Sequence, residues 1–159
     1  MANDESDNLI DLLSETHSRT LLLIRGNDLE MPVYEDGSWR IRDILGHIAT
    51  WDRQVSLSLR AFTQESEYSI PDFEEHAFND EDVKKQGALT EQQIFDEWLA
   101  AREVFKEAVQ AVPQDLYLGD LLYPCGDERG TVANLVREMC EHDQEHYGEI
   151  AKALSWPPR

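Results

Sequence analysis

The pattern of apolar residues along the chain predicts four long amphipathic helices. Within each, apolar residues recur at spacings of three and four, which places them on one helical face. The helices are expected over residues of about 8–25, 40–63, 90–112 and 131–154. Ser38 is a plausible N-cap for the second helix, and Thr90 with Gln93 forms a capping box at the start of the third. Pro113 ends the third helix, because proline cannot continue one.

The segments between these helices are long. Residues 27–39, 64–89 and 113–130 are rich in acidic residues, proline and glycine, and the middle segment has a possible short helix near 80–86. Four apolar stripes can bury one another in a bundle, so we expect an all-α fold, a single four-helix bundle domain over residues 1–159. Long connections also allow neighbouring helices to run parallel, unlike the tight turns of a simple up-and-down bundle.

The chain is strongly acidic. It has 33 acidic residues against 14 lysines and arginines, a formal net charge of −19. Such a surface repels phosphate backbones and anionic membranes, so we expect neither nucleic acid nor membrane as a partner. The acidity either serves solubility or attracts cations. This charge does not exclude a small-molecule substrate, which is the partner we expect.

The two cysteines, Cys125 and Cys140, form no CxxC motif and no disulfide framework, which fits a reducing compartment. Cys140 is expected to be a packed thiol, and the sequence suggests no role for Cys125. The first residues, MANDESDN, are polar and acidic, unlike a signal peptide. No apolar run approaches the roughly 18 residues that span a bilayer. We therefore expect a soluble cytoplasmic protein.

Two histidines, His142 and His146, lie four residues apart in the stretch EMCEHDQEHYGEI. At about 100° per residue from Met139, the centre of the apolar face, His146 lies about 20° away and His142 about 60°. Both are therefore expected within the apolar arc, one turn apart, where they can share one cation as in helical HxxxH zinc sites. Histidines at the core edge, hydrogen-bonded to neighbours, are the alternative. Glu145 and Glu149 flank the pair and are expected in solvent.

A metal site needs a third ligand, and His47 is the candidate. It lies on the flank of the apolar face of helix 40–63, beside Ile44 and Trp51, from where its side chain can reach a neighbouring helix. Three neutral imidazoles from two helices would form a facial triad with coordination positions open to water. That arrangement is typical of catalytic rather than structural sites.

Other polar residues have two interpretations each. Asp52 and Asp143 project into otherwise apolar arcs, and a buried carboxylate needs a partner. That partner is either the outer nitrogen of a metal-bound histidine or, in a plain salt bridge, Arg102 or another base. His17, on the inner face of the first helix, is a core histidine, a residue that supports a metal ligand from behind or, like Arg102, a substrate contact. His76, in the loop DFEEHAF, is expected in solvent or at the mouth of the site.

Two segments resemble the DinB/YfiT-like family of four-helix proteins. SWRIRDILGHIATWDRQV, residues 38–55, is similar to a family pattern with a tryptophan, then an aspartate, leucines and a histidine, then Trp-Asp. GTVANLVREMCEHDQEHYGEI, residues 130–150, is similar to the last helix of the family, with its HxxxH and following isoleucine. Together the segments cover about a quarter of the chain, and no GxSxG or phosphate-binding loop offers a competing motif.

This resemblance implies a metal site, a fold and a set of activities. In the family, the histidine of the second helix and the HxxxH pair bind a divalent metal, often nickel or zinc; by position these are His47, His142 and His146. The family fold is a bundle of unusual connectivity, often dimeric, so a homodimer is expected. Characterised relatives include metal-dependent thiol transferases that use bacillithiol or mycothiol, and the mycothiol-dependent maleylpyruvate isomerase. A related branch opens a cyclopropane by hydrolysis.

Three functions follow as hypotheses. The first is a metal-dependent thiol S-transferase, in which the metal ionises a low-molecular-weight thiol whose carboxylates are anchored by Arg42, Arg53 or Arg102. The second is a metal-dependent hydrolase with Asp52 or Asp143 as general base. The third is a stress-related protein that binds a metal or a small toxin without turnover.

Overall fold

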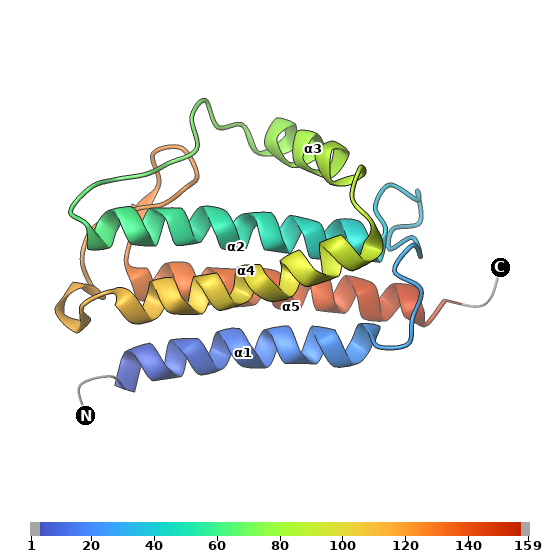
Figure 1. Ribbon diagram of the computed structural model, residues 1–159, viewed down its shortest axis with the longest axis horizontal. Helices are drawn as coiled ribbons and strands as arrows, with labels where there is room; N and C mark the ends of the chain where they lie inside the picture. Colours follow the sequence, from blue (N-terminus) through green and yellow to red (C-terminus); the bar gives the residue numbers. More distant parts are fainter. Residues whose placement is uncertain (1–3, 157–159) are drawn as a thin grey trace.

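The computed structural model describes residues 4–156, and its long helices lie side by side (Figure 1). The helices are α1 (Asp4–Ile24), α2 (Ile41–Thr63), α3 (Glu75–Gln86), α4 (Glu91–Ala111) and α5 (Val132–Leu154), with a 3-10 turn at Gln114–Leu116 and a two-stranded hairpin, β1 (Leu121–Leu122) and β2 (Arg129–Gly130). The predicted all-α four-helix bundle is confirmed. Residues 1–3 and 157–159 of the expected domain lie outside the described residues. No described helix has the length and apolarity needed to cross a membrane.

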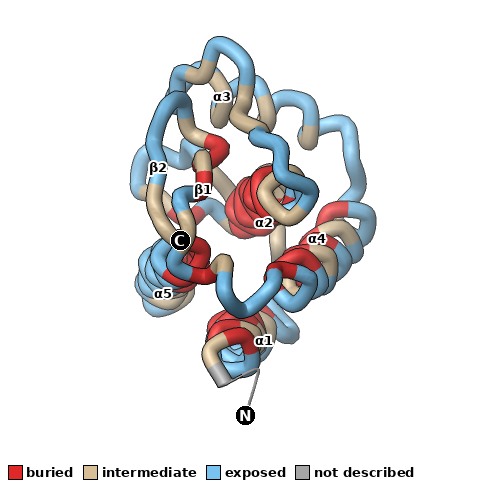
Figure 2. The backbone as a smooth tube through the Cα atoms, turned by 90° about the vertical axis from the view of Figure 1, so that its left-hand side faces the viewer, coloured by how far each residue is buried: buried red, intermediate tan, exposed pale blue. Residues whose placement is uncertain are grey.

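The connectivity of the bundle is not up-and-down. Viewed along the bundle, α1 lies opposite α2 and α4 opposite α5, and each helix packs against the other two (Figure 2). Helices α1 and α5 run in one direction and α2 and α4 in the other (Figure 1). The neighbours α2 and α4 are therefore parallel, as are α1 and α5. Such neighbours require the long connections that the sequence shows.

Polar caps define where the helices begin. The predicted capping box is present at α4, where the Thr90 hydroxyl accepts from the Gln93 N–H at 3.1 Å and Gln93 accepts from the Thr90 N–H at 2.9 Å. The prediction of Ser38 as the cap of α2 was wrong. Arg40 is the N-cap, and its N–H donates to the Asp43 carboxylate at 2.9 Å. The chain pairs back on itself at Pro32 and Arg40, so helical geometry cannot begin before that bridge.

The core is divided into two apolar clusters by a layer of buried polar side chains. Leu13, Leu59 and Phe105 belong to one cluster, and Ile44 and Trp98 to the other. The polar side chains come from all four long helices. Buried among them are Thr16, His17, Thr20, His47, Asp52, Arg102, Asp143 and His146. A buried polar group must find a partner or bind a ligand, so this layer is where function is to be sought.

Helix α3 packs on the outside of α2 through polar contacts and through Phe78, whose ring meets Trp51, and none of its residues is fully buried (Figure 1). Its end is held by Gln86, whose amide nitrogen lies 2.9 Å from the Gly46 carbonyl and 2.9 Å from the Thr50 hydroxyl. A Cβ atom at Gly46 would lie 1.9 Å from Oε1 of Gln86. Glycine at position 46 is therefore what allows Gln86 to dock on α2.

Gly46→Ala is expected to loosen α3 while leaving the bundle folded. The flexible Gln86 side chain can move away, so the steric cost is small, but its hydrogen bonds to α2 are lost. We expect amide exchange in residues 75–86 to accelerate about tenfold, the equivalent of one to two ordinary hydrogen bonds. Gly148→Ala is the control, because its Cβ meets nothing within 4 Å, and alanine there should stabilise α5 by up to about 1 kcal/mol. Unchanged exchange in α3 of Gly46→Ala would contradict this role for Gln86.

Candidate metal centre

Three histidine side chains converge between α2 and α5. His47 comes from α2, and His142 and His146 come from successive turns of α5. Nε2 of His142 lies 3.1 Å from Nε2 of His47 and 3.1 Å from Nε2 of His146. One ligand atom of each residue lies within 4.8 Å of those of the others. The structure thus brings together the three side chains that the sequence singled out.

Burial keeps these imidazoles neutral at neutral pH. Burial, with smaller contributions from the nearby His142 and His146, lowers the pKa of His47 to about 2. Burial likewise lowers the pKa of His142 and of His146 to about 4 each. A neutral imidazole offers a lone pair to a metal, whereas a protonated one does not.

The spacing of the nitrogens fits one divalent ion. At the usual zinc–nitrogen distance, two ligand nitrogens of a tetrahedral ion are about 3.3 Å apart. The observed separations of 3.1 Å are close to this value. A ring nitrogen carries one proton or one lone pair, so Nε2 of His142 can form a well-directed hydrogen bond with only one of its two neighbours. An ion between them would satisfy all three lone pairs together.

The outer nitrogens of these rings are poorly partnered among the described residues. Nδ1 of His47 and Nδ1 of His142 are buried without a hydrogen bond. The Glu149 carboxylate lies 3.0 Å from Nδ1 of His146, outside hydrogen-bond geometry. The expectation that Glu149 lies free in solvent is therefore corrected, because it is half-buried against this ring.

A cavity of about 510 Å³ opens at the three histidines. Its other walls come from the 27–39 segment, from α2, α3 and α5, and from the hairpin loop. Besides the histidines, the lining residues are Tyr34, Trp39, Trp51, Glu75, Asn79, Cys125, Glu138, Met139 and Glu145. A cavity of this size beside three converging imidazoles suits a small-molecule site.

Asp52 and Asp143 do not contact the histidines; both bind Arg102. Nε of Arg102 lies 2.8 Å from the Asp52 carboxylate, and its Nη1 lies 2.7 Å from the Asp143 carboxylate. Of the two interpretations of these aspartates, the structure shows the salt bridge. None of the three lines the cavity, which removes the geometric support for either aspartate as general base and for Arg102 as a substrate contact.

Comparison with known proteins places this chain in a family. Residues 11–145 match the family model described as the mycothiol maleylpyruvate isomerase N-terminal domain. The chain belongs to this family. The comparison with curated proteins gave no match.

The family fold also appears in a solved structure. The chain superposes on the structure of YfiT from Bacillus subtilis with a TM-score of 0.76. YfiT is described as a probable metal-dependent hydrolase with an unusual four-helix bundle topology. The likeness covers 99% of this chain and 91% of YfiT at 15% identity, so it establishes the fold alone. The resemblance to DinB/YfiT-like proteins expected from the sequence is confirmed.

In this family member His17 is a core residue. Its ring stacks on Trp98 with centroids 3.7 Å apart, and it does not line the cavity. Burial, together with the neighbouring charge of Arg102, lowers the pKa of His17 to about 3. His17 therefore matches the interpretation as a core histidine rather than a substrate contact.

Protonation of His17 is expected to destabilise the fold in acid. The pKa of His17 is about 3 when folded, against about 6.5 in an unfolded chain. The stability that the neutral His17 ring contributes to the fold is therefore fully present above pH 6.5 and is lost as the pH falls toward 3. Between pH 7 and pH 5, we expect metal-free wild type to lose about 2 kcal/mol more unfolding free energy than His17→Phe. Urea denaturation measures this, and parallel profiles would contradict it; His76→Gln, at an exposed position, should keep the wild-type profile.

The sequence did not single out several residues of the cavity. Tyr34 lies in a predicted connection, where an aromatic residue in an otherwise polar segment was the only signal. Trp39 is the tryptophan of the family pattern that residues 38–55 resemble, but the sequence assigned it no role in the site. Cys125 lies in the hairpin loop, whose two-residue strands are too short for an alternating pattern. His76 itself is exposed and does not line the cavity, whereas its neighbour Glu75 does.

Proposed function

We propose that this chain is a metal-dependent enzyme that transfers a low-molecular-weight thiol to an electrophilic small molecule. His47, His142 and His146 hold the divalent ion, which is nickel or zinc. The supporting observation is the convergence of three neutral imidazole nitrogens on a cavity of about 510 Å³. Membership of a family described by a mycothiol-dependent isomerase domain supports the thiol as co-substrate.

A divalent ion held by imidazoles lowers the pKa of a coordinated thiol or water, because its positive charge stabilises the deprotonated form. The protein must accept the released proton, and Glu138 is the residue we assign. It lines the cavity one turn before His142. Burial raises the pKa of Glu138, and the charges of Glu128 and Glu141 raise it further, which makes it a stronger base.

The reaction then balances as a substitution. A sulfur–carbon bond forms as the bond from that carbon to its leaving group breaks, and the thiol proton passes through Glu138 to the leaving group. Water in place of the thiol makes the same site a hydrolase. The likeness of the fold to YfiT, itself described as a probable metal-dependent hydrolase, makes this the second candidate.

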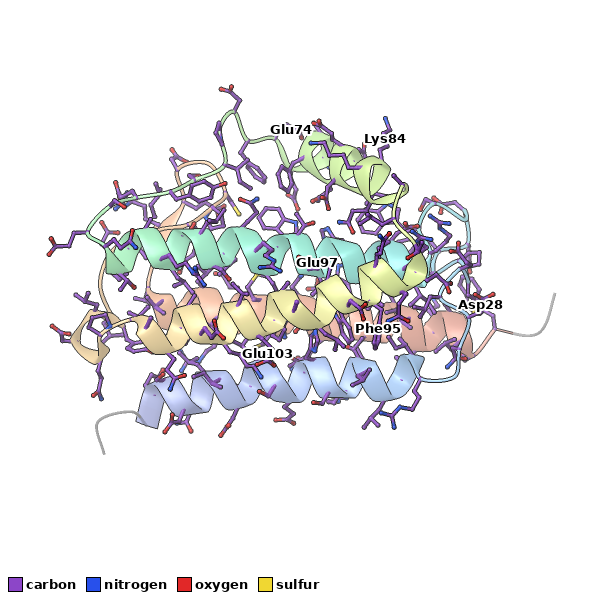
Figure 3. All side chains as sticks on the ribbon, in the orientation of Figure 1. Asp28, Glu74, Lys84, Phe95, Glu97 and Glu103 are labelled. Carbon is purple, nitrogen blue, oxygen red and sulfur yellow. The ribbon has the colours of Figure 1, made fainter. Side chains whose placement is uncertain are left out.

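Assays with and without thiol separate the two reactions. Untagged protein loaded with nickel or zinc is incubated with 1-chloro-2,4-dinitrobenzene and a panel of low-molecular-weight thiols. We expect thiol-dependent turnover that falls at least about 100-fold in Glu138→Gln, the usual contribution of a general base. Glu103→Gln, on the outer face of α4, should retain wild-type rates (Figure 3). Turnover without thiol favours the hydrolase, and no turnover in either assay contradicts both.

Two further expectations stay predictions. A homodimer, expected from the family resemblance, is checked by analytical ultracentrifugation of the metal-loaded protein. Residence in the cytoplasm is checked by fractionation of the native host.

A further inference from the structure

The walls of the cavity carry negative charge. Glu75 from α3 and Glu138 and Glu145 from α5 line it, and no lysine or arginine is among the described lining residues. Three carboxylates outweigh the charge of one divalent ion held by neutral imidazoles. A carboxylate-bearing thiol or electrophile would therefore enter against net repulsion.

The arginines expected to anchor such carboxylates are engaged elsewhere. Arg42 donates to the Glu30 carboxylate at 2.8 Å and to the Leu89 carbonyl. Arg53 donates to Glu97 at 2.8 Å, on the face of α4 seen in Figure 3. Arg102 is buried between two aspartates. All three arginines expected to anchor a substrate carboxylate are therefore paired with carboxylates of the protein.

Aromatic side chains complete the walls. Trp39 packs on His47 with ring centroids 5.1 Å apart, and Trp51 and Tyr34 also line the cavity. The indole N–H of Trp51 donates to Asn79 at 3.0 Å, which holds this ring against α3. Aromatic faces combined with carboxylates are the usual surroundings of ammonium groups, since both attract a cation with little hydration.

The negative charges of the cavity act on the thiol of Cys125. Burial, with smaller contributions from the carboxylates of Glu128, Glu75 and Glu138, raises the pKa of Cys125 to about 11. Two of these carboxylates are cavity-lining residues, so their charges act at the sulfur. Cys125 is therefore a reporter of the potential that a substrate meets.

We propose that the substrate of this site is cationic: an electrophile or a thiol that carries a protonated amine or a quaternary ammonium group and no carboxylate. This proposal rests on the proposed function, because it concerns the same cavity. The ammonium group lies between the carboxylates and the aromatic walls, and the reacting group faces the histidines. Substrates with carboxylates are excluded by charge.

The first test uses Cys125 as the only thiol, in a Cys140→Ala background without metal. Modification rates are compared for methanethiosulfonates that carry a trimethylammonium or a sulfonate group, each normalised to its rate with free cysteine. We expect the cationic reagent to react at least about tenfold faster. Glu75→Gln and Glu138→Gln should each lower this ratio about threefold, while Glu103→Gln, with the same change in net charge, leaves it unchanged. Equal ratios in all variants would overturn the proposal.

The second test needs no cysteine variant. Tryptophan fluorescence measures binding of benzyltrimethylammonium and of phenylacetate to wild type, metal-free and metal-loaded. We expect the cation to bind at least about tenfold more tightly in both forms. Equal or tighter binding of phenylacetate in either form overturns the proposal and leaves the metal-dependent reaction standing. Failure of the protein to bind metal overturns the proposed function instead. The charge preference of the cavity is still measured in that case, because the metal-free protein is tested separately.

Discussion

Alanine in place of His142 is expected to abolish stoichiometric metal binding. The wild-type chain should hold about one nickel or zinc ion, because its three neutral imidazoles can surround one. His142 is central, since its Nε2 lies 3.1 Å from those of both other histidines. Its loss leaves two ligands on different helices, which rarely make a tight site. We expect affinity to fall at least about 100-fold, as measured by calorimetry and by metal analysis of untagged protein.

The control for this variant is His76→Ala, which removes an exposed imidazole from α3. It should bind metal as wild type does. Circular dichroism should show both variants folded, because His142 is only half-buried and its ring packs on the rings of His47 and His146. One ion per chain in His142→Ala would show that the cluster is a packing feature rather than a metal site.

Replacement of Arg102 by methionine is expected to destabilise the fold by about 3–5 kcal/mol. The Arg102 side chain is 1% exposed and forms ion pairs with Asp52 and Asp143, which are 0% and 3% exposed. Methionine would leave two carboxylates in the core without a positive partner. Even in wild type, burial raises the pKa of Asp52 to about 6. Urea denaturation at pH 7.5 measures the loss.

Two comparisons make this prediction specific. Arg53→Met breaks a pair whose side chains are 40% and 43% exposed, and it should cost no more than about 1 kcal/mol. In the triple variant Arg102→Met, Asp52→Asn, Asp143→Asn, no buried charge is left unpaired, so most of the lost stability should return. A loss for Arg102→Met no larger than for Arg53→Met would contradict the role of the buried ion pair.

The ion pair also connects the core to the candidate metal centre. Asp143 follows His142 directly on α5, and Asp52 lies five residues after His47 on α2. Arg102 on α4 joins both helices through these carboxylates, and the Thr16 hydroxyl of α1 donates to Asp143 at 2.8 Å. We therefore interpret Arg102 as a positioning residue, which holds α2 and α5 where their histidines meet.

The sequence was sufficient for elements with a strong periodic pattern. The stripes of α2, α4 and α5 located these helices to within about two residues, because one face of each must leave water. The start of α1 was missed by four residues, because residues 4–7 are polar and show no stripe. Helix α3 was predicted only over 80–86 and spans Glu75–Gln86, because it has no buried residue and hence no apolar period.

The sequence also determined the chemistry available, since the spacing of His142 and His146 on one helical face follows from the helix alone. Only the tertiary structure decided which partner the buried aspartates have. It also decided that Tyr34, Glu75 and Cys125 meet around the histidines. None of the described residues that line this cavity is an arginine. These contacts join residues far apart in the chain. They depend on which helices become neighbours and on how the long connections close over them, and no local pattern encodes either.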